Sequence, residues 1–133
     1  MRSPREILSL VPLAQRMGIT RIVITHPLER SVLEAVLTPE EVKGLAQLGA
    51  FIEYCFIGLM PTGGRQRPRD VADSIRDVGA AHCILSSDFG QIQNPYPAEG
   101  MRLFIALMLQ SGFTPAEVEL MVKANPRRLL DLG

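Results

Sequence analysis

The sequence predicts an α/β fold built on a parallel sheet. Three short apolar runs, centred on Val23, Ile52 and Ile84, are rich in β-branched and aromatic residues, as buried strands are. Segments with helical start and stop signals lie before, between and after these runs. Because strands that alternate with helices over short connections favour a parallel sheet, the order of the elements indicates the fold class.

Helix starts follow a repeated pattern of a hydroxyl cap, a proline and a glutamate. Ser3, Thr38 and Thr114 each precede a proline, and each has a glutamate three residues further on. The expected helices cover residues 4–17, 39–48, 68–78, 98–110 and 115–123, and the expected strands cover residues 21–25, 51–56 and 83–85. Residues 28–37 show no clear period.

A parallel sheet of only three strands leaves a problem of burial. Right-handed crossovers would place all the helices on one face of the sheet, yet the strands are apolar on both faces. We therefore expect a partial (β/α)8 barrel, in which these are the last three strands and the bare face is the barrel interior. Residues 1–133 would then form a single α/β domain, the C-terminal portion of such a barrel. A small doubly wound three-stranded parallel sheet is the alternative.

Polar side chains follow the expected strands, where parallel sheets place their sites. His26 precedes Pro27, Glu53 lies within the second run, and Ser86 and Asp88 follow the third. Alternation predicts that His26, Glu53 and Asp88 share the inward face, and an imidazole with two carboxylates suits a divalent metal. The structural alternatives are a core histidine, a glutamate paired with an arginine, and an aspartate that caps a turn.

Composition excludes several classes of function. Basic and acidic side chains balance at 14 each, aromatic residues make up 5% and Trp is absent, which argues against nucleic-acid and anionic-membrane partners. No apolar run approaches the ~20 residues of a membrane span. Cys55 and Cys83 both lie in expected strands, and we expect them to be reduced, buried thiols in a cytoplasmic protein.

The loop after the second strand carries glycines at the outer spacing of a P-loop. It has Gly64 and Arg65 where that motif needs Lys and Ser or Thr, so a phosphate site of this type is not expected. Arg65 and Arg67 are candidates for contact with an anionic substrate, and solvation is the structural alternative for both.

Five segments together resemble the C-terminal part of an amidohydrolase-type metal-dependent hydrolase. They are RIVITHP (21–27), AFIEYCF (50–56), ILSSDFGQ (84–91), NPYPAEGMRLFI (94–105) and NPRRLLDL (125–132). The resemblance implies a (β/α)8 barrel that acts on a small-molecule substrate with zinc or manganese. It implies that His26 binds the metal, and that Asp88 binds the metal and carries the proton of the activated water. Glu53 and Ser86 would line the site.

The sequence departs from that family in its histidines. The family carries a His-x-His pair on its first strand, whereas this sequence has only His26 and His82, and His82 precedes its strand. We therefore expect the isolated chain to bind metal weakly or not at all, and to be active only with the missing N-terminal strands. The alternative is a non-catalytic truncated half-barrel that associates with itself or another chain through its bare sheet face.

Overall fold

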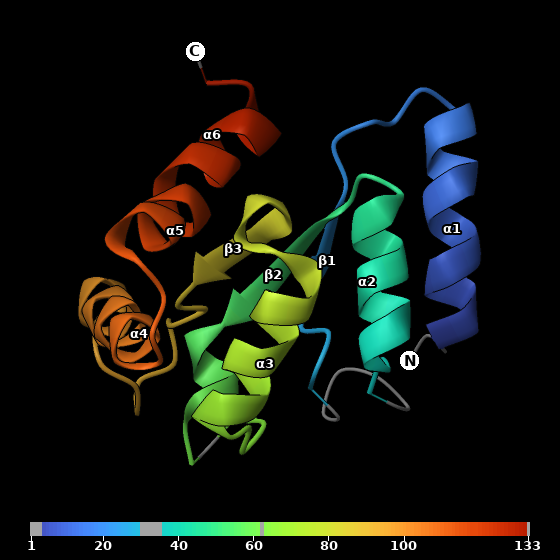
Figure 1. Ribbon diagram of the computed structural model, residues 1–133. Coiled ribbons are helices and arrows are strands. Elements are labelled where there is room, and N and C mark those ends of the chain that lie inside the picture. Colours follow the sequence, from blue (N-terminus) through green and yellow to red (C-terminus); the bar gives the residue numbers. More distant parts are fainter. Residues whose placement is uncertain (1–3, 30–35, 62, 133) are drawn as a thin grey trace.

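The computed structural model describes residues 4–29, 36–61 and 63–132, and it confirms an α/β fold with a three-stranded parallel sheet. The strands are β1 (Val23–Thr25), β2 (Phe51–Cys55) and β3 (Cys83–Ser86), and they lie in the order β1-β2-β3 (Figure 1). Both neighbouring pairs are parallel. The size of the sheet matches the smaller alternative, and its strands follow one another in chain order.

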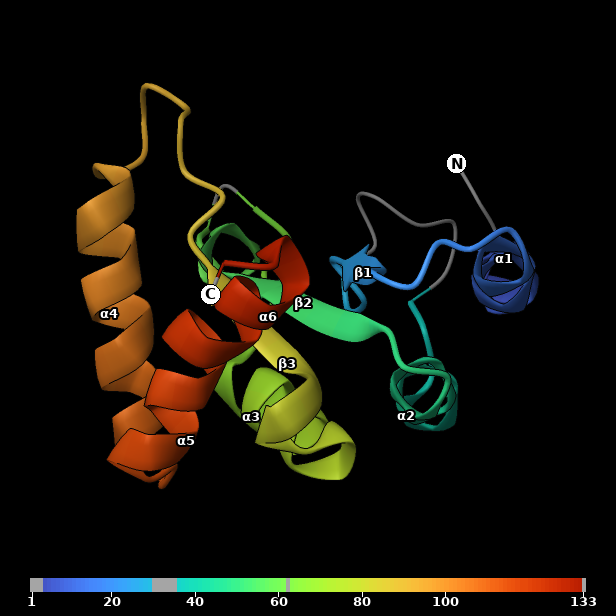
Figure 2. The ribbon, with the colours of Figure 1, turned by 90° about the horizontal axis from the view of Figure 1, so that it is seen from above.

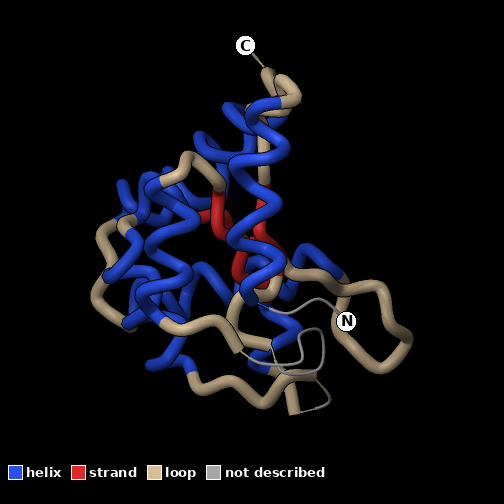
Figure 3. Tube along the Cα trace, turned by 90° about the vertical axis from the view of Figure 1, so that its right-hand side faces the viewer, coloured by secondary structure: helices blue, strands red, loops and turns tan. Residues whose placement is uncertain are grey.

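Helices and short helical turns make up most of the described residues, as Figure 3 shows. In chain order they are α1 (Pro4–Arg16), α2 (Pro39–Gln47), α3 (Pro68–Val78), α4 (Pro97–Gln110), α5 (Pro115–Glu119) and α6 (Asn125–Leu130). Short 3₁₀ turns, η1 (Phe56–Leu59) and η2 (Ala80–His82), follow β2 and precede β3, and a π-helical turn, η3 (Leu120–Ala124), joins α5 to α6. These bounds agree with the expected elements except at the C-terminal end.

Two of the three expected helix caps form as predicted. At α2 and at α5, Thr38 and Thr114 each accept a hydrogen bond from the amide three residues on, and the glutamate there accepts from the cap amide. The third, Ser3, lies outside the described residues. Each capping box satisfies two amides that the helix itself leaves without partners.

The helix expected over residues 115–123 is wrong in its C-terminal part. It ends at Glu119, and the amide of Asn125 then donates to the carbonyl of Leu120, five residues back. The side chain of Asn125 is fully buried and donates to the carbonyls of Ala80 and Cys83, at 2.8 and 2.7 Å. The π turn therefore places Asn125 where its side chain can bond to the start of β3. The capping box at Thr114 predicts where the helix begins, but it does not predict this π turn.

One face of the sheet packs against α2 and α3, which lie together on one side of it in Figure 2. The side chains of this face alternate along each strand and are buried, or in the case of Ile24 partly buried, among apolar residues of the two helices. They are Ile24, Ile52, Tyr54, Cys83 and Leu85, packed with Val42, Leu45, Val71 and Ile75. These side chains form the main hydrophobic core of the fold.

The other face is partly covered, contrary to the expectation of a bare face. Thr25, Glu53 and Ile84 are register neighbours on it. A groove of about 470 Å³ runs over this face, and α4, η3 and α6 supply part of its wall through Met101, Val122 and Leu129. The C-terminal helices therefore shield the β3 side of this face.

Within the described residues, none of the helices combines the length and the hydropathy that crossing a bilayer requires.

Candidate metal centre

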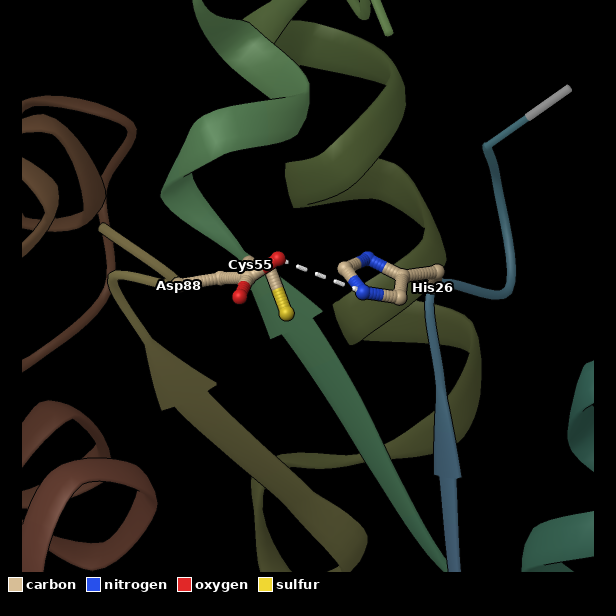
Figure 4. Close-up of side chains that lie close together, drawn as sticks. All are labelled: His26, Cys55 and Asp88. Atoms are coloured by element: carbon tan, nitrogen blue, oxygen red, sulfur yellow. Dashed lines mark ion pairs between the residues drawn. The ribbon is translucent and has the colours of Figure 1, made fainter. Parts of the chain in front are cut away.

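The carboxyl ends of the three strands bring together His26, Cys55 and Asp88. One ligand atom from each of these side chains lies within 4.8 Å of the other two. His26 Nε2 lies 3.4 Å from Asp88 Oδ2, and Figure 4 shows the thiol of Cys55 between the ends of the two side chains. A nitrogen, a sulfur and a carboxylate oxygen from three neighbouring strands therefore converge on one point.

Left-handed backbone conformations place two of these three residues. His26 has φ 60° and Asp88 has φ 51°, values that non-glycine residues adopt uncommonly but that Asp and His tolerate better than most. The expected alternation is wrong for the first strand, since the register pairs Thr25, not His26, with Glu53. His26 reaches Cys55 and Asp88 because the chain turns there, after the strand has ended at Thr25.

A buried glutamate orients the imidazole of His26. Glu29 Oε1 lies 2.8 Å from His26 Nδ1, and Glu29 is only 4% exposed. An ionised carboxylate only accepts hydrogen bonds, so Nδ1 donates and Nε2 is the nitrogen that faces Asp88. A histidine that binds a metal through one ring nitrogen usually donates the hydrogen of the other to such a carboxylate, which fixes the orientation of the ring.

Two glycines make the space for Glu29. A Cβ at Gly58 would stand 2.6 Å from Glu29 Oε1, and a Cβ at Gly64 would stand 3.1 Å from Glu29 Cγ. The turn after β2 thus closes over the carboxylate only because these two residues have no side chain.

The surroundings of His26 favour its protonated form in the metal-free protein. Hydrogen bonds with Cys55 and with Glu29 raise the pKa of His26 to about 10, against the lowering effect of burial. A metal that binds Nε2 must therefore displace this proton.

The other predicted site residues lie at different distances from this group. Ser86 is in contact with it, because its Oγ lies 3.3 Å from Cys55 Sγ. Glu53 lies outside the His26–Cys55–Asp88 group and accepts a hydrogen bond of 2.7 Å from Thr25 Oγ1. Arg67 pairs with Asp70 at 2.9 Å on the surface, and Arg65 is exposed in a left-handed turn.

Two members of the site, Cys55 and Glu29, are not among the residues that the sequence predicts for it. The sequence predicts a structural thiol at Cys55, which in the structure ends its strand level with Ser86. Glu29 stands three residues after His26, a spacing that would have indicated a local carboxylate–histidine pair. It lies in a segment with no period, which is why periodicity gave no reason to examine it.

The N-terminal part of the chain matches a known protein family. Residues 2–53 match a protein family described as a family of unknown function (DUF6282). The match covers less than half of the chain, and it includes His26, Glu29 and Glu53 but neither Cys55 nor Asp88. No curated protein matches the chain significantly.

Proposed function

We propose that His26, Cys55 and Asp88 hold a divalent metal, and that the chain carries the metal centre of a hydrolase that uses metal-activated water. The observation that carries this proposal is the convergence of three ligand atoms within 4.8 Å, with Glu29 2.8 Å behind the imidazole. This set differs from the one expected from sequence, because a thiol takes the place of the Glu53 carboxylate.

The ligand types favour zinc over manganese. Thiolate and imidazole ligands suit zinc, whereas manganese prefers carboxylates, carbonyls and water. Three protein ligands with a fourth position left for water is the arrangement of catalytic zinc sites. The Asp88 side chain is 46% exposed, so solvent and substrate have access to this side of the group.

Each residue has a distinct task in this proposal. The metal would supply a bound water of lowered pKa. Asp88 lies at the exposed side and would accept the proton of that water and pass it to the leaving group. Glu29 holds His26 in the tautomer that turns Nε2 toward the ligands, and Ser86 holds the thiol of Cys55 by a hydrogen bond.

The partial (β/α)8 barrel belongs to the same proposal. Neighbouring strands of such barrels are parallel, sequential and joined through helices, and their sites lie at the carboxyl ends of the strands. The order β1-β2-β3 and the location of His26, Cys55 and Asp88 are consistent with both features. In the family that the sequence resembles, a His-x-His pair adds metal ligands. The two histidines of this chain are His26 and His82, so such a pair would come from outside residues 1–133.

Cobalt substitution tests the metal centre without relying on activity. Co²⁺ bound to a thiolate gives a charge-transfer absorption that reports directly on the Cys–metal bond. The chain offers matched controls, since it has two cysteines and two histidines and one of each lies in the cluster. We expect the absorption to be lost in Cys55→Ala and His26→Ala and kept in Cys83→Ala and His82→Ala. Equal absorption in all four variants would refute the ligand assignment.

Hydrolysis is tested separately, because metal binding does not establish a reaction. Chelator-treated protein is assayed on activated esters and amides, with and without added Zn²⁺ or Mn²⁺. The assay is repeated with a longer polypeptide or partner chain that supplies further strands. We expect metal-dependent turnover that is lost in His26→Ala and kept in His82→Ala. If the protein bound metal but showed no turnover under any of these conditions, the metal site would be structural and the proposal of a hydrolase would be wrong.

A second candidate function is association through the β1 edge. In the described sheet β1 pairs only with β2, and an apolar groove of about 270 Å³ runs between β1 and α1, lined by Val11, Ala14 and Ile24 among others. An exposed edge strand beside an apolar groove can accept a further strand. Sedimentation tests it: a concentration-dependent dimer that is lost when the 40% exposed Val23 is replaced in Val23→Lys supports association, and a monomer throughout the micromolar range contradicts it.

A further inference from the structure

The groove on the second face of the sheet begins next to the metal ligands. Ser86 lines this groove and also contacts the thiol of Cys55 at 3.3 Å. A molecule that lies in the groove can therefore reach the cluster at the strand ends. Its volume of about 470 Å³ falls within the range of small-molecule sites, ~300–1,000 Å³.

The wall of the groove is mainly apolar. Its apolar residues come from two strands and from the C-terminal helices, and they include Val23, Ile84, Met101, Val122, Leu129 and Leu130. Leu130 is 62% exposed and Val23 is 40% exposed, so part of this wall is open to solvent. Such a wall favours the apolar body of a ligand.

A single carboxylate, that of Glu53, faces this apolar groove. It accepts a hydrogen bond from Thr25 Oγ1 at 2.7 Å, and in the described part of the chain no basic side chain pairs with it. The guanidinium of Arg128 lies over the ring of Phe51, two residues back along β2, 5.5 Å from the ring centroid. A half-buried anion that lacks a protein cation is stabilised by a ligand cation.

We infer that this groove binds an organic cation: a small molecule with an apolar body and one ammonium or guanidinium group, held by Glu53. The apolar body lies against Val23, Ile84 and Leu130, and the charged group donates hydrogen bonds to the oxygen of Glu53 that Thr25 leaves free. As a substrate class this inference rests on the proposed function, whereas binding of the cation to the groove does not.

Three probes of one shape and different charge test the inference. Benzylammonium, benzyl alcohol and benzoate are titrated into chelator-treated protein at pH 7, and binding is followed by the amide NMR shifts of Val23, Glu53 and Ile84. We expect benzylammonium to bind roughly tenfold more tightly than benzyl alcohol, because a charge-assisted hydrogen bond replaces a neutral one, and benzoate to bind least.

Two variants separate the carboxylate from the groove. Glu53→Gln keeps an oxygen for the Thr25 hydrogen bond and removes the charge, so benzylammonium should fall to the affinity of benzyl alcohol. Glu40→Gln removes an exposed charge in the first turn of α2 and should change nothing. Leu130→Trp narrows the open side of the groove and should weaken the binding of benzylammonium and of benzyl alcohol alike.

The outcomes also distinguish this inference from the proposed function. Equal binding of the amine and the alcohol, or unchanged amine binding in Glu53→Gln, would overturn the inference even where cobalt binds through Cys55. Glu53-dependent binding of the amine would support it even where no metal binds.

Discussion

Glu29 and His26 form a buried carboxylate–imidazole pair, with Oε1 2.8 Å from Nδ1, three residues apart in a loop that follows an edge strand. The pair exists because the chain turns back at His26 with φ 60°, which brings the carboxylate of Glu29 behind the ring. Gly58, in the turn η1 that follows β2, closes over that carboxylate. The pair leaves Nε2 as the nitrogen directed toward Cys55 and Asp88.

Glu29→Gln should weaken metal binding without removing a ligand. The amide no longer carries the charge that holds the Nδ1 proton, so the pKa of His26 should fall and its ring orientation should loosen. The affinity for zinc, corrected for the His26 proton that the metal displaces, should drop by about 10–100-fold, as for other partners of metal-bound histidines. Zinc competition and NMR titration of the His26 ring measure both effects. Glu40→Gln is the control, and an equal loss there would show a general charge effect.

The sequence predicted the core of this fold better than its site. The strands around Ile52 and Ile84 and the caps at Thr38 and Thr114 depend on local pattern, and all four formed as expected. His26 could be placed at a strand end because Pro27 follows it. Its direction could not be predicted, because a single left-handed residue cancels the alternation that the prediction used.

The remaining members of the site depend on contacts between distant segments. Cys55 has the composition of an ordinary buried thiol, and only the register with Ser86 and the turn at His26 bring it to the ligands. Nothing in the sequence around Asn125 predicts that its side chain donates a hydrogen bond to Cys83 of β3, 42 residues away along the chain. Tertiary pairing of this kind has no local pattern to detect.

The metal-free protein should lose stability as the pH rises from about 6.5 toward 9. The pKa of His26 is raised from 6.5 to about 10 in the folded state, so the folded chain binds more protons than the unfolded one in this range. The contribution is fully present below pH 6.5 and declines above it, by at most ~1.4 kcal/mol per pH unit for one proton. Urea unfolding at several pH values measures this slope.

The thiol of Cys83 limits the pH range over which this slope reports on His26 alone. Burial raises the pKa of the Cys83 thiol to about 12 from 9.0, so above pH 9 ionisation of the unfolded thiol adds a further loss of stability. Below pH 9, His26→Gln should flatten the slope and His82→Gln should keep it. A wild-type slope that persists in His26→Gln would assign the effect to another group.

Gly58→Ala should disturb the site more than the fold. Its new Cβ would stand 2.6 Å from Glu29 Oε1 and 2.9 Å from the end of Gln66, both atoms at the ends of flexible side chains. The carboxylate should move away from His26, so zinc binding should weaken while the melting temperature changes little. Gly44→Ala, in the middle of α2 with open space around it, should instead stabilise the protein by ~1 kcal/mol.

Gly63 provides the contrasting case. A Cβ there would stand 1.9 Å from the backbone oxygen of Ile57, which cannot move aside without shifting the turn. Gly63→Ala should therefore lower the melting temperature clearly. If Gly58→Ala destabilised the protein as much as Gly63→Ala, the glycine at position 58 would serve the fold and not the placement of Glu29.

Asn125→Ala should destabilise the protein by ~2–4 kcal/mol. The substitution removes two hydrogen bonds and leaves the carbonyls of Ala80 and Cys83 without these donors in a buried position. Denaturant unfolding measures the loss. Gln93→Ala, on an exposed loop, should have no measurable effect. A loss below 0.5 kcal/mol (about half of one typical net hydrogen bond) would mean that water satisfies both carbonyls.

Asp88→Asn should separate the chemistry of the site from its scaffold. The carboxylate of Asp88 is 46% exposed and 3.4 Å from His26, so solvent screens the pair and its loss should cost less than ~1 kcal/mol. Asn tolerates φ 51° as well as Asp does, so the backbone gives no further penalty. Zinc affinity should nevertheless fall, and metal-dependent hydrolysis should be lost with the proton acceptor.

The loop after Asp88 supplies the matched control. This loop, which projects away from α2 and α3 in Figure 2, is tied by Gln91, whose side chain donates to the Asp88 carbonyl and accepts from Asn94. Gln91→Ala should therefore loosen the loop, seen as faster amide exchange, while the metal ligands stay in place. If Asp88 acted only as a turn residue, Asp88→Asn would keep both zinc affinity and hydrolysis. Calorimetry, zinc competition and hydrolysis assays on the two variants decide between these roles. If Asp88 is a ligand that also carries the proton, Asp88→Asn loses zinc affinity and hydrolysis while the fold keeps its stability.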